Sequence, residues 1–97
     1  MYLELFRWGP WTEGEELFNA LERGFLPAAY EYLYLTGDKE GLRRTVLKVL
    51  DLPLKGEVRE RLLWLLRVLD RIYFTEREDD WIMVRIPGRV IGWIRRW

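Results

Sequence analysis

The sequence contains no cysteine, histidine, serine or glutamine, and Asn19 is its single asparagine. The absence of cysteine excludes a disulfide framework and a thiolate metal site. Without serine, cysteine and histidine, the chain cannot form the nucleophile and base triads that are commonest in enzyme active sites. Neither a glycine-rich phosphate loop nor a dinucleotide-binding fingerprint occurs. We therefore expect a protein that is not an enzyme and has no catalytic residues, cofactor or metal ion.

Long apolar runs are also missing. The longest, Leu62–Leu66, is far shorter than the roughly 18 residues that suggest a membrane span. Residues 1–4 have no cationic region followed by an apolar stretch, so a secretory signal is not expected. We predict a cytoplasmic protein without a membrane partner. Its 97 residues suffice for one compact domain over 1–97 and are too few for two.

Leucine, arginine and glutamate are abundant, and there are six tryptophans. Few thermolabile side chains and many charged ones are typical of a thermophile's protein, whether cellular or viral. Chance or design bias in a short chain is the alternative. The sixteen basic and sixteen acidic residues cancel, but the sign of the charge alternates along the chain: negative over 1–36, positive over 37–75, negative over 76–80 and positive over 81–97. The net charge therefore leaves the charge of a partner open.

The first part of the chain predicts a strand followed by a helix. Residues 2–8 alternate in the manner of a short strand, and Gly9-Pro10 ends it. Thr12 and Glu15 have the spacing of a capping box, which predicts a first helix over 12–23.

Two further helices are predicted on either side of a turn at 36–38. Pro27 suits the first turn of a helix, although the tyrosines leave a strand over 30–35 as an alternative. The apolar spacing after the turn predicts a third helix, Lys39–Leu50, whose outer side carries Arg43, Arg44 and Lys48.

The longest predicted helix runs from Lys55 to about Thr75. Trp64 and Val68 lie together on a second apolar side of this helix because they are four residues apart. Either the helix runs through the middle of the fold, or its second side contacts a partner. The broad stripe expected to face the core consists of Val58, Leu62, Leu65, Leu66, Leu69, Ile72 and Tyr73.

The last seventeen residues hold three tryptophans and four arginines, with no acidic residue. They predict a β-hairpin with strands over 81–86 and 90–97. Pro87-Gly88 favours a type II turn, which does not match the twist of a two-residue hairpin, so we expect a longer loop or a bulge. The predicted fold class is α+β, with an N-terminal strand, four helices and a C-terminal hairpin forming a small antiparallel sheet.

Alternation along the hairpin separates an apolar side from a side rich in tryptophan and arginine. The expected inward side chains are Ile82, Val84, Ile86, Val90 and Ile94. The opposite face carries Trp81, Met83, Arg85, Ile91, Trp93, Arg95 and Trp97.

Tryptophan and arginine are enriched in the hot spots of protein interfaces. We therefore predict a regulatory or adaptor protein that binds another protein, or a copy of itself in a homodimer. The predicted anchors are Trp81, Arg85, Trp93, Arg95 and Trp97, with Trp64 and Val68 as a second contact. Coverage of these tryptophans within the fold and stacking on single-stranded nucleic acid are the alternatives.

The second helix, the turn and the third helix also fit a helix-turn-helix, with the hairpin as a wing. In this alternative the protein is a winged-helix-like DNA-binding transcriptional regulator that uses Arg43, Arg44 and Lys48. The zero net charge and the long helix before the supposed wing favour it less.

The acidic residues Glu76, Glu78, Asp79 and Asp80 are the best candidates for a Mg²⁺ or Ca²⁺ site, because these ions prefer carboxylate oxygens. The cluster lacks the spacing and the central glycine of a calcium loop. A run of acids in a connection is usually solvated, so we expect no metal ion here.

Overall fold

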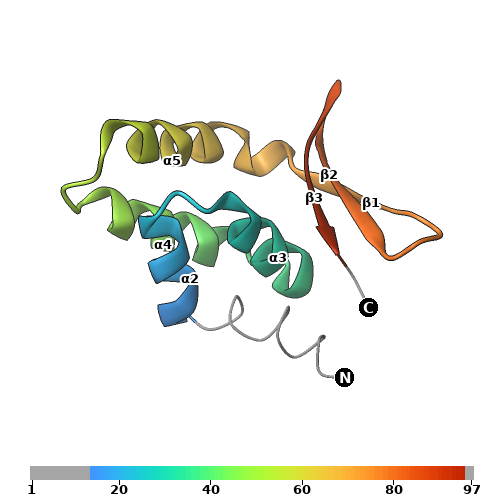
Figure 1. Cartoon of the computed structure of the whole chain (residues 1–97), viewed down its shortest axis with the longest axis horizontal. Helices are drawn as coiled ribbons and strands as arrows, with labels where there is room; N and C mark the ends of the chain where they lie inside the picture. Colours follow the sequence, from blue (N-terminus) through green and yellow to red (C-terminus); the bar gives the residue numbers. More distant parts are fainter. Residues whose placement is uncertain (1–13, 96–97) are drawn as a thin grey trace.

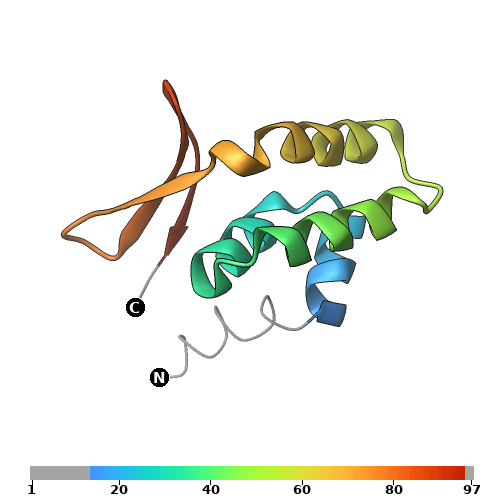
Figure 2. The ribbon, with the colours of Figure 1, turned by 180° about the vertical axis from the view of Figure 1, so that it is seen from behind.

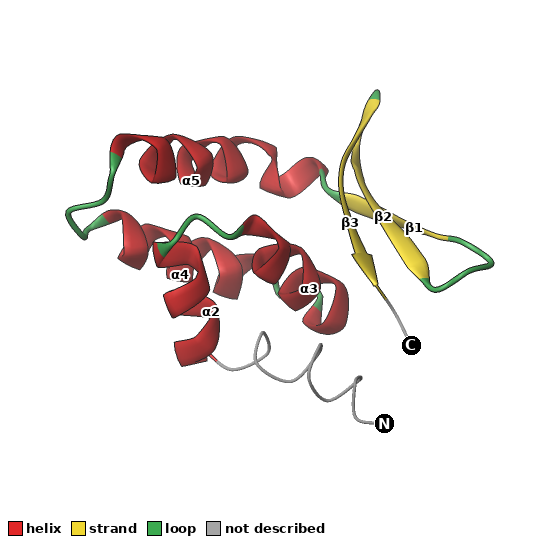
Figure 3. Cartoon of the chain, in the orientation of Figure 1, coloured by secondary structure: helices red, strands yellow, loops and turns green. Residues whose placement is uncertain are grey.

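The computed structural model of the protein describes residues 14–95, which form four helices and a three-stranded sheet (Figure 1, Figure 3). This arrangement confirms the predicted α+β class. The strand predicted over 2–8 lies outside the described residues. In chain order the elements are α2 (Gly14–Glu22), α3 (Leu26–Thr36), α4 (Lys39–Leu50), α5 (Gly56–Val68), the 3-10 helix η2 (Leu69–Arg71), β1 (Tyr73–Glu76), β2 (Trp81–Ile86) and β3 (Arg89–Arg95).

The helices lie together, and the sheet stands at one end of them (Figure 1, Figure 2). α4 and α5 run in opposite directions, while α2 and α3 pack on each other and on α4. The strands pair antiparallel in the order β1-β2-β3, and β3 packs on α3. Within residues 14–95, no helix has both the length and the apolar character that crossing a membrane requires.

The turn between α3 and α4 shows why α3 ends and α4 begins close to the predicted turn at 36–38. Gly37 adopts a left-handed conformation, with φ of 68°, and its N–H donates to the carbonyl of Leu33. Asp38 then caps α4, because its carboxylate accepts a hydrogen bond from the N–H of Gly41 at 2.8 Å. The predicted helix over 39–50 is confirmed, and the alternative strand over 30–35 is wrong because these residues belong to α3.

One core joins the helices to the inner face of the sheet. Ile82, Val84 and Ile94 are buried on the sheet side. The predicted stripe of the fourth helix is buried at Val58, Leu62, Leu65, Leu69 and Ile72. Val68 is buried as well, so α5 faces the core with more than one side.

The prediction that the fourth helix continues to about Thr75 is wrong. α5 ends at Val68, η2 adds one turn, and β1 begins at Tyr73. Residues 73–76 pair with residues 82–85 of β2. Tyr, Phe and Thr favour strands, and this long-range pairing satisfies their backbone groups in a sheet. Tyr73, expected in the core, is consequently exposed.

A bulge in β3 changes which side chains of the hairpin face inward. Pro87 and Gly88 make a two-residue turn between Ile86 and Arg89, and the expected bulge is present, because Val84 pairs with Gly92 while Arg85 pairs with Val90. The extra residue reverses the alternation. Val90, predicted to face inward, is therefore 39% exposed, and Ile91, predicted on the opposite face, packs against the core.

The cap of α4 should make stability depend on pH. The hydrogen bonds from the Gly41 N–H and the Tyr32 hydroxyl hold the pKa of Asp38 below its ordinary value. A carboxyl whose pKa is lower in the folded state than in the unfolded state stabilises the fold at neutral pH, and this stabilisation is lost as the pH falls through the lowered pKa. Urea denaturation at pH 7 and at about pH 2.5 should show that Asp38→Ala is destabilising at neutral pH and much less so in acid.

Asp38→Asn is the matched control, because asparagine also caps helices but does not titrate. The difference in free energy of unfolding between Asp38→Asn and Asp38→Ala should depend little on pH. An equal cost of Asp38→Ala at both pH values would contradict this account of the cap.

Candidate functional site

The side of the sheet that faces away from α3 carries aromatic and arginine side chains from all three strands. Cross-strand pairing places Trp81 opposite Arg95 and Tyr73 opposite Arg85. Trp93 lies on the same side, opposite Met83. We call this surface the outer face and define it by Tyr73, Arg77, Trp81, Arg85, Trp93 and Arg95.

Each aromatic ring of the outer face has a guanidinium group beside it. The Cζ atom of Arg85 lies 5.8 Å from the ring centre of Tyr73, and that of Arg95 lies 5.4 Å from the ring centre of Trp81. Such cation–π contacts restrain both partners without removing the rings from water. Tyr73, Trp81 and Trp93 remain 43%, 39% and 44% exposed.

The β1–β2 connection supplies the third arginine. The Cζ atom of Arg77 lies 5.5 Å from the ring centre of Trp93, and its Nη2 lies 3.4 Å from Oδ2 of Asp79. The other oxygen of Asp79 accepts a hydrogen bond from the backbone N–H of Trp81 at 3.1 Å. Together with the two tryptophans, these side chains line a hollow of about 410 Å³. The connection therefore orients a cation and an anion at one edge of the outer face.

The structure brings together four of the predicted anchors, namely Trp81, Arg85, Trp93 and Arg95. Trp97 lies outside the described residues. The predicted second contact does not extend this surface, because Val68 is buried and Trp64 is half-buried against the core on α5.

Sequence reasoning missed Tyr73 and Arg77. Both lie in residues for which the sequence predicts the end of the fourth helix and a polar connection. The signal that could have found Tyr73 is the run Tyr73-Phe74-Thr75, in which each residue type favours a strand.

The basic side of α4 is less available than the sequence suggests. Arg43 forms ion pairs with Asp70 and with Glu40, and these partners hold its pKa above the ordinary value. Arg44 and Lys48 are exposed on the same helix.

The acidic residues of 76–80 do not converge in the structure. Glu76 accepts a hydrogen bond from the hydroxyl of Tyr34. Asp79 forms an ion pair with Arg77 and accepts a hydrogen bond from the backbone N–H of Trp81 at the start of β2. In the part of the chain that the structure describes, no group of three acidic residues is placed to hold a metal ion.

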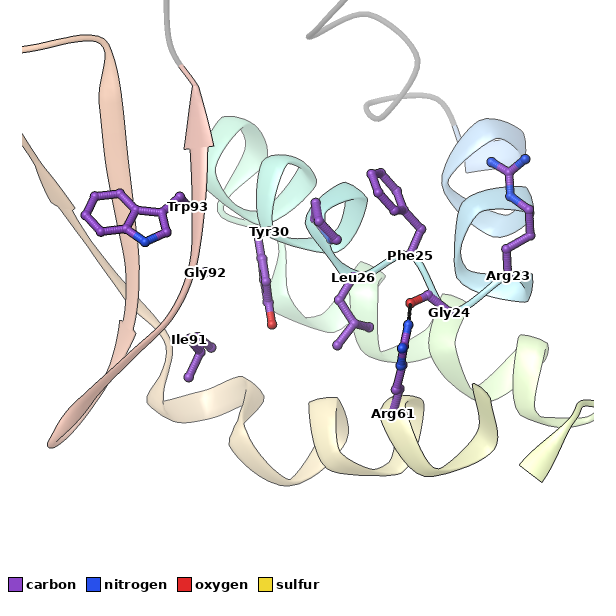
Figure 4. A pocket seen from close by; sticks show the side chains of 10 residues that line it. Arg23, Gly24, Phe25, Leu26, Tyr30, Arg61, Ile91, Gly92 and Trp93 are labelled. Carbon is purple, nitrogen blue, oxygen red and sulfur yellow. Dashed lines mark hydrogen bonds between the residues drawn. The ribbon is translucent and has the colours of Figure 1, made fainter. Parts of the chain in front are cut away.

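The contact between the inner side of β3 and α3 determines where the outer face lies relative to the helices. The ring of Tyr30 lies directly over Gly92, and a Cβ atom added to Gly92 would lie 2.9 Å from Cε2 of Tyr30. Tyr30 and Trp93 lie on opposite sides of β3 (Figure 4). Because Gly92 has no side chain, α3 can pack closely on one face of β3 while Trp93 lies on the other.

Comparison of the chain with protein-family models, curated proteins and solved structures found no match.

Gly92→Ala should destabilise the protein by about 1–3 kcal/mol, because the added methyl group cannot fit beside a ring that is itself buried. Chemical denaturation measures this cost. Gly56→Ala is the control, since a Cβ there meets no atom within 4 Å and should change stability by only about 0.5 kcal/mol.

A double-mutant cycle with Tyr30→Leu tests the cause. Removing the ring should lower the cost of Gly92→Ala, since the two residues are in contact. An identical cost in both backgrounds would show that the Tyr30 ring is not what requires glycine at position 92.

Proposed function

We propose that the protein is a small non-catalytic regulatory or adaptor protein of the cytoplasm that docks on an acidic surface of another protein through the outer face. The observation that carries this proposal is the exposure of Tyr73, Trp81 and Trp93 on one face of a sheet whose other face is buried. Covering the exposed part of each tryptophan, on the order of 100 Å², would contribute about 2 kcal/mol.

The charge of the outer face supports an acidic partner. The strands direct Arg85 and Arg95 outward, and none of the side chains that they direct outward is acidic. The neighbouring Asp79 is paired with Arg77. A second copy of the chain would bring the same positive charges against each other, which disfavours self-docking through this face.

Arginine and tryptophan suit this role for physical reasons. A guanidinium forms two parallel hydrogen bonds with a carboxylate and stacks on an aromatic ring at the same time. Arg85 and Arg95 are already ordered beside Tyr73 and Trp81, so less conformational entropy is lost when a partner binds.

The DNA-binding alternative has less support. It requires Arg43, Arg44 and Lys48 to reach phosphates, and Arg43 is held by Glu40 and Asp70. Two exposed cations on one helix are a small basic surface for a DNA-binding domain.

The test is affinity capture from an extract of the source cells, followed by reconstitution with the purified partner. The wild-type protein should retain a specific acidic protein, and Trp81→Ala/Trp93→Ala should bind it at least about thirtyfold more weakly, because both hot-spot rings are lost. Circular dichroism of the variant should match the wild type. Nuclease treatment should leave capture unchanged.

Leu47→Ala is the matched control, because Leu47 is an exposed apolar side chain on α4, outside the outer face. It should bind like the wild type. Equal retention by the double tryptophan variant, or loss of capture on nuclease treatment, would contradict the proposal.

A further inference from the structure

A groove of about 660 Å³ runs between the edge of β3, the α2–α3 connection and α5 (Figure 4). Its volume lies within the range of roughly 300–1,000 Å³ that is usual for ligand sites. Most of its lining is apolar, with Leu26, Tyr30 and Ile91 along it and Trp93 at one end.

The opposite end of the groove is cationic. Arg23 and Arg61 lie at the side away from Trp93 (Figure 4). Nη1 of Arg61 donates a hydrogen bond to the carbonyl oxygen of Gly24 at 3.2 Å, which orients its guanidinium. Among the residues that the structure describes, neither arginine forms an ion pair, and no acidic side chain lines the groove.

The hydroxyl of Tyr30 points into the groove between the two ends (Figure 4). The hydroxyl is protonated at neutral pH and can donate a hydrogen bond, and burial, which raises the pKa of Tyr30 to about 12, keeps it so over a wider range of pH. An occupant that has an apolar part toward β3 and a negative charge toward α5 would match each of these surfaces.

We propose that the groove binds a peptide segment of the partner in which apolar side chains are followed by carboxylates. This inference rests on the proposed function, since it places part of the same partner beside the outer face. Charge complementarity selects the carboxylates, because two arginines and no acidic side chain line this end of the groove. The open form of the groove suits a segment of chain lying across the surface.

Trp93 joins the groove to the outer face. It lines the groove on one side and the hollow with Trp81, Arg77 and Asp79 on the other. A partner whose acidic surface covers the outer face can therefore place a neighbouring segment in the groove without a gap between the two contacts.

The test is an NMR titration of the ¹⁵N-labelled full chain with two matched probes, acetyl-Leu-Phe-Glu-Glu-amide and acetyl-Leu-Phe-Lys-Lys-amide. The acidic peptide should shift the amide signals of Leu26, Tyr30 and Ile91 and the Nε–Hε signal of Arg61, with a Kd of about 1 mM. The basic peptide should bind at least about tenfold more weakly, because its charge is repelled by both arginines.

Arg23→Gln and Arg61→Gln should each weaken the acidic peptide by about two- to fivefold, as expected for exposed ion pairs. Arg61→Lys should keep the preference for the acidic peptide. Arg67→Gln is the matched control, because Arg67 is an exposed arginine on the same helix that does not line the groove. It should leave binding unchanged.

Equal binding of the two peptides, shifts confined to the outer face, or no shift at about 5 mM acidic peptide would overturn the inference. Other results would show that the proposed function, and not the groove, is wrong. If the double tryptophan variant still captured the partner while the acidic peptide still bound the groove, the outer face would be wrong and the groove would remain. If capture depended on Trp81 and Trp93 and the acidic peptide did not bind, only the groove would be wrong.

Discussion

The packing of α3 against the inner face of the sheet is the contact on which the rest of the structure depends. Tyr30 lies over Gly92 of β3, and Tyr34 meets Phe74 of β1 edge to face, with ring centres 5.2 Å apart. These two rings pack on the inner face at both edge strands. With α3 in place, Ile82, Val84 and Ile94 are buried without a further helix over them. The helices bury the inner face of the sheet, and none of the described elements packs on the opposite face.

That asymmetry explains the chemistry of the outer face. A solvent-facing side of an antiparallel sheet normally carries polar residues, whereas here the strands direct Tyr73, Trp81 and Trp93 outward. The neighbouring arginines form cation–π contacts with these rings, and their charges keep the surface hydrated. The same bulge in β3 that turns Val90 outward turns Ile91 toward the core and the groove.

Local signals predicted much of the fold, and long-range pairing decided the rest. The turn at 36–38 and the apolar spacing after it predicted α4 to the residue, and alternation placed Trp81, Arg85, Trp93 and Arg95 on one face. The end of the fourth helix could not be placed because Ile72 and Tyr73 continue its apolar spacing, and the pairing of 73–76 with β2 is not a local property. The bulge was expected, but its position was not, since the register of a hairpin is specified by the face that it buries against the rest of the fold.

We infer that the outer face is uncovered in the free protein and covered in its complex with a partner. Solvent paramagnetic relaxation of the tryptophan indole N–H signals, measured with a soluble gadolinium chelate, tests it most directly. We expect strong relaxation of the Trp81 and Trp93 signals in the protein alone, with the buried Ile82 and Ile94 methyl groups little affected. Both indoles should become protected when the purified partner is added. Protection of both indoles in the protein alone would mean that the chain itself covers the outer face, and a partner could not then dock there as proposed.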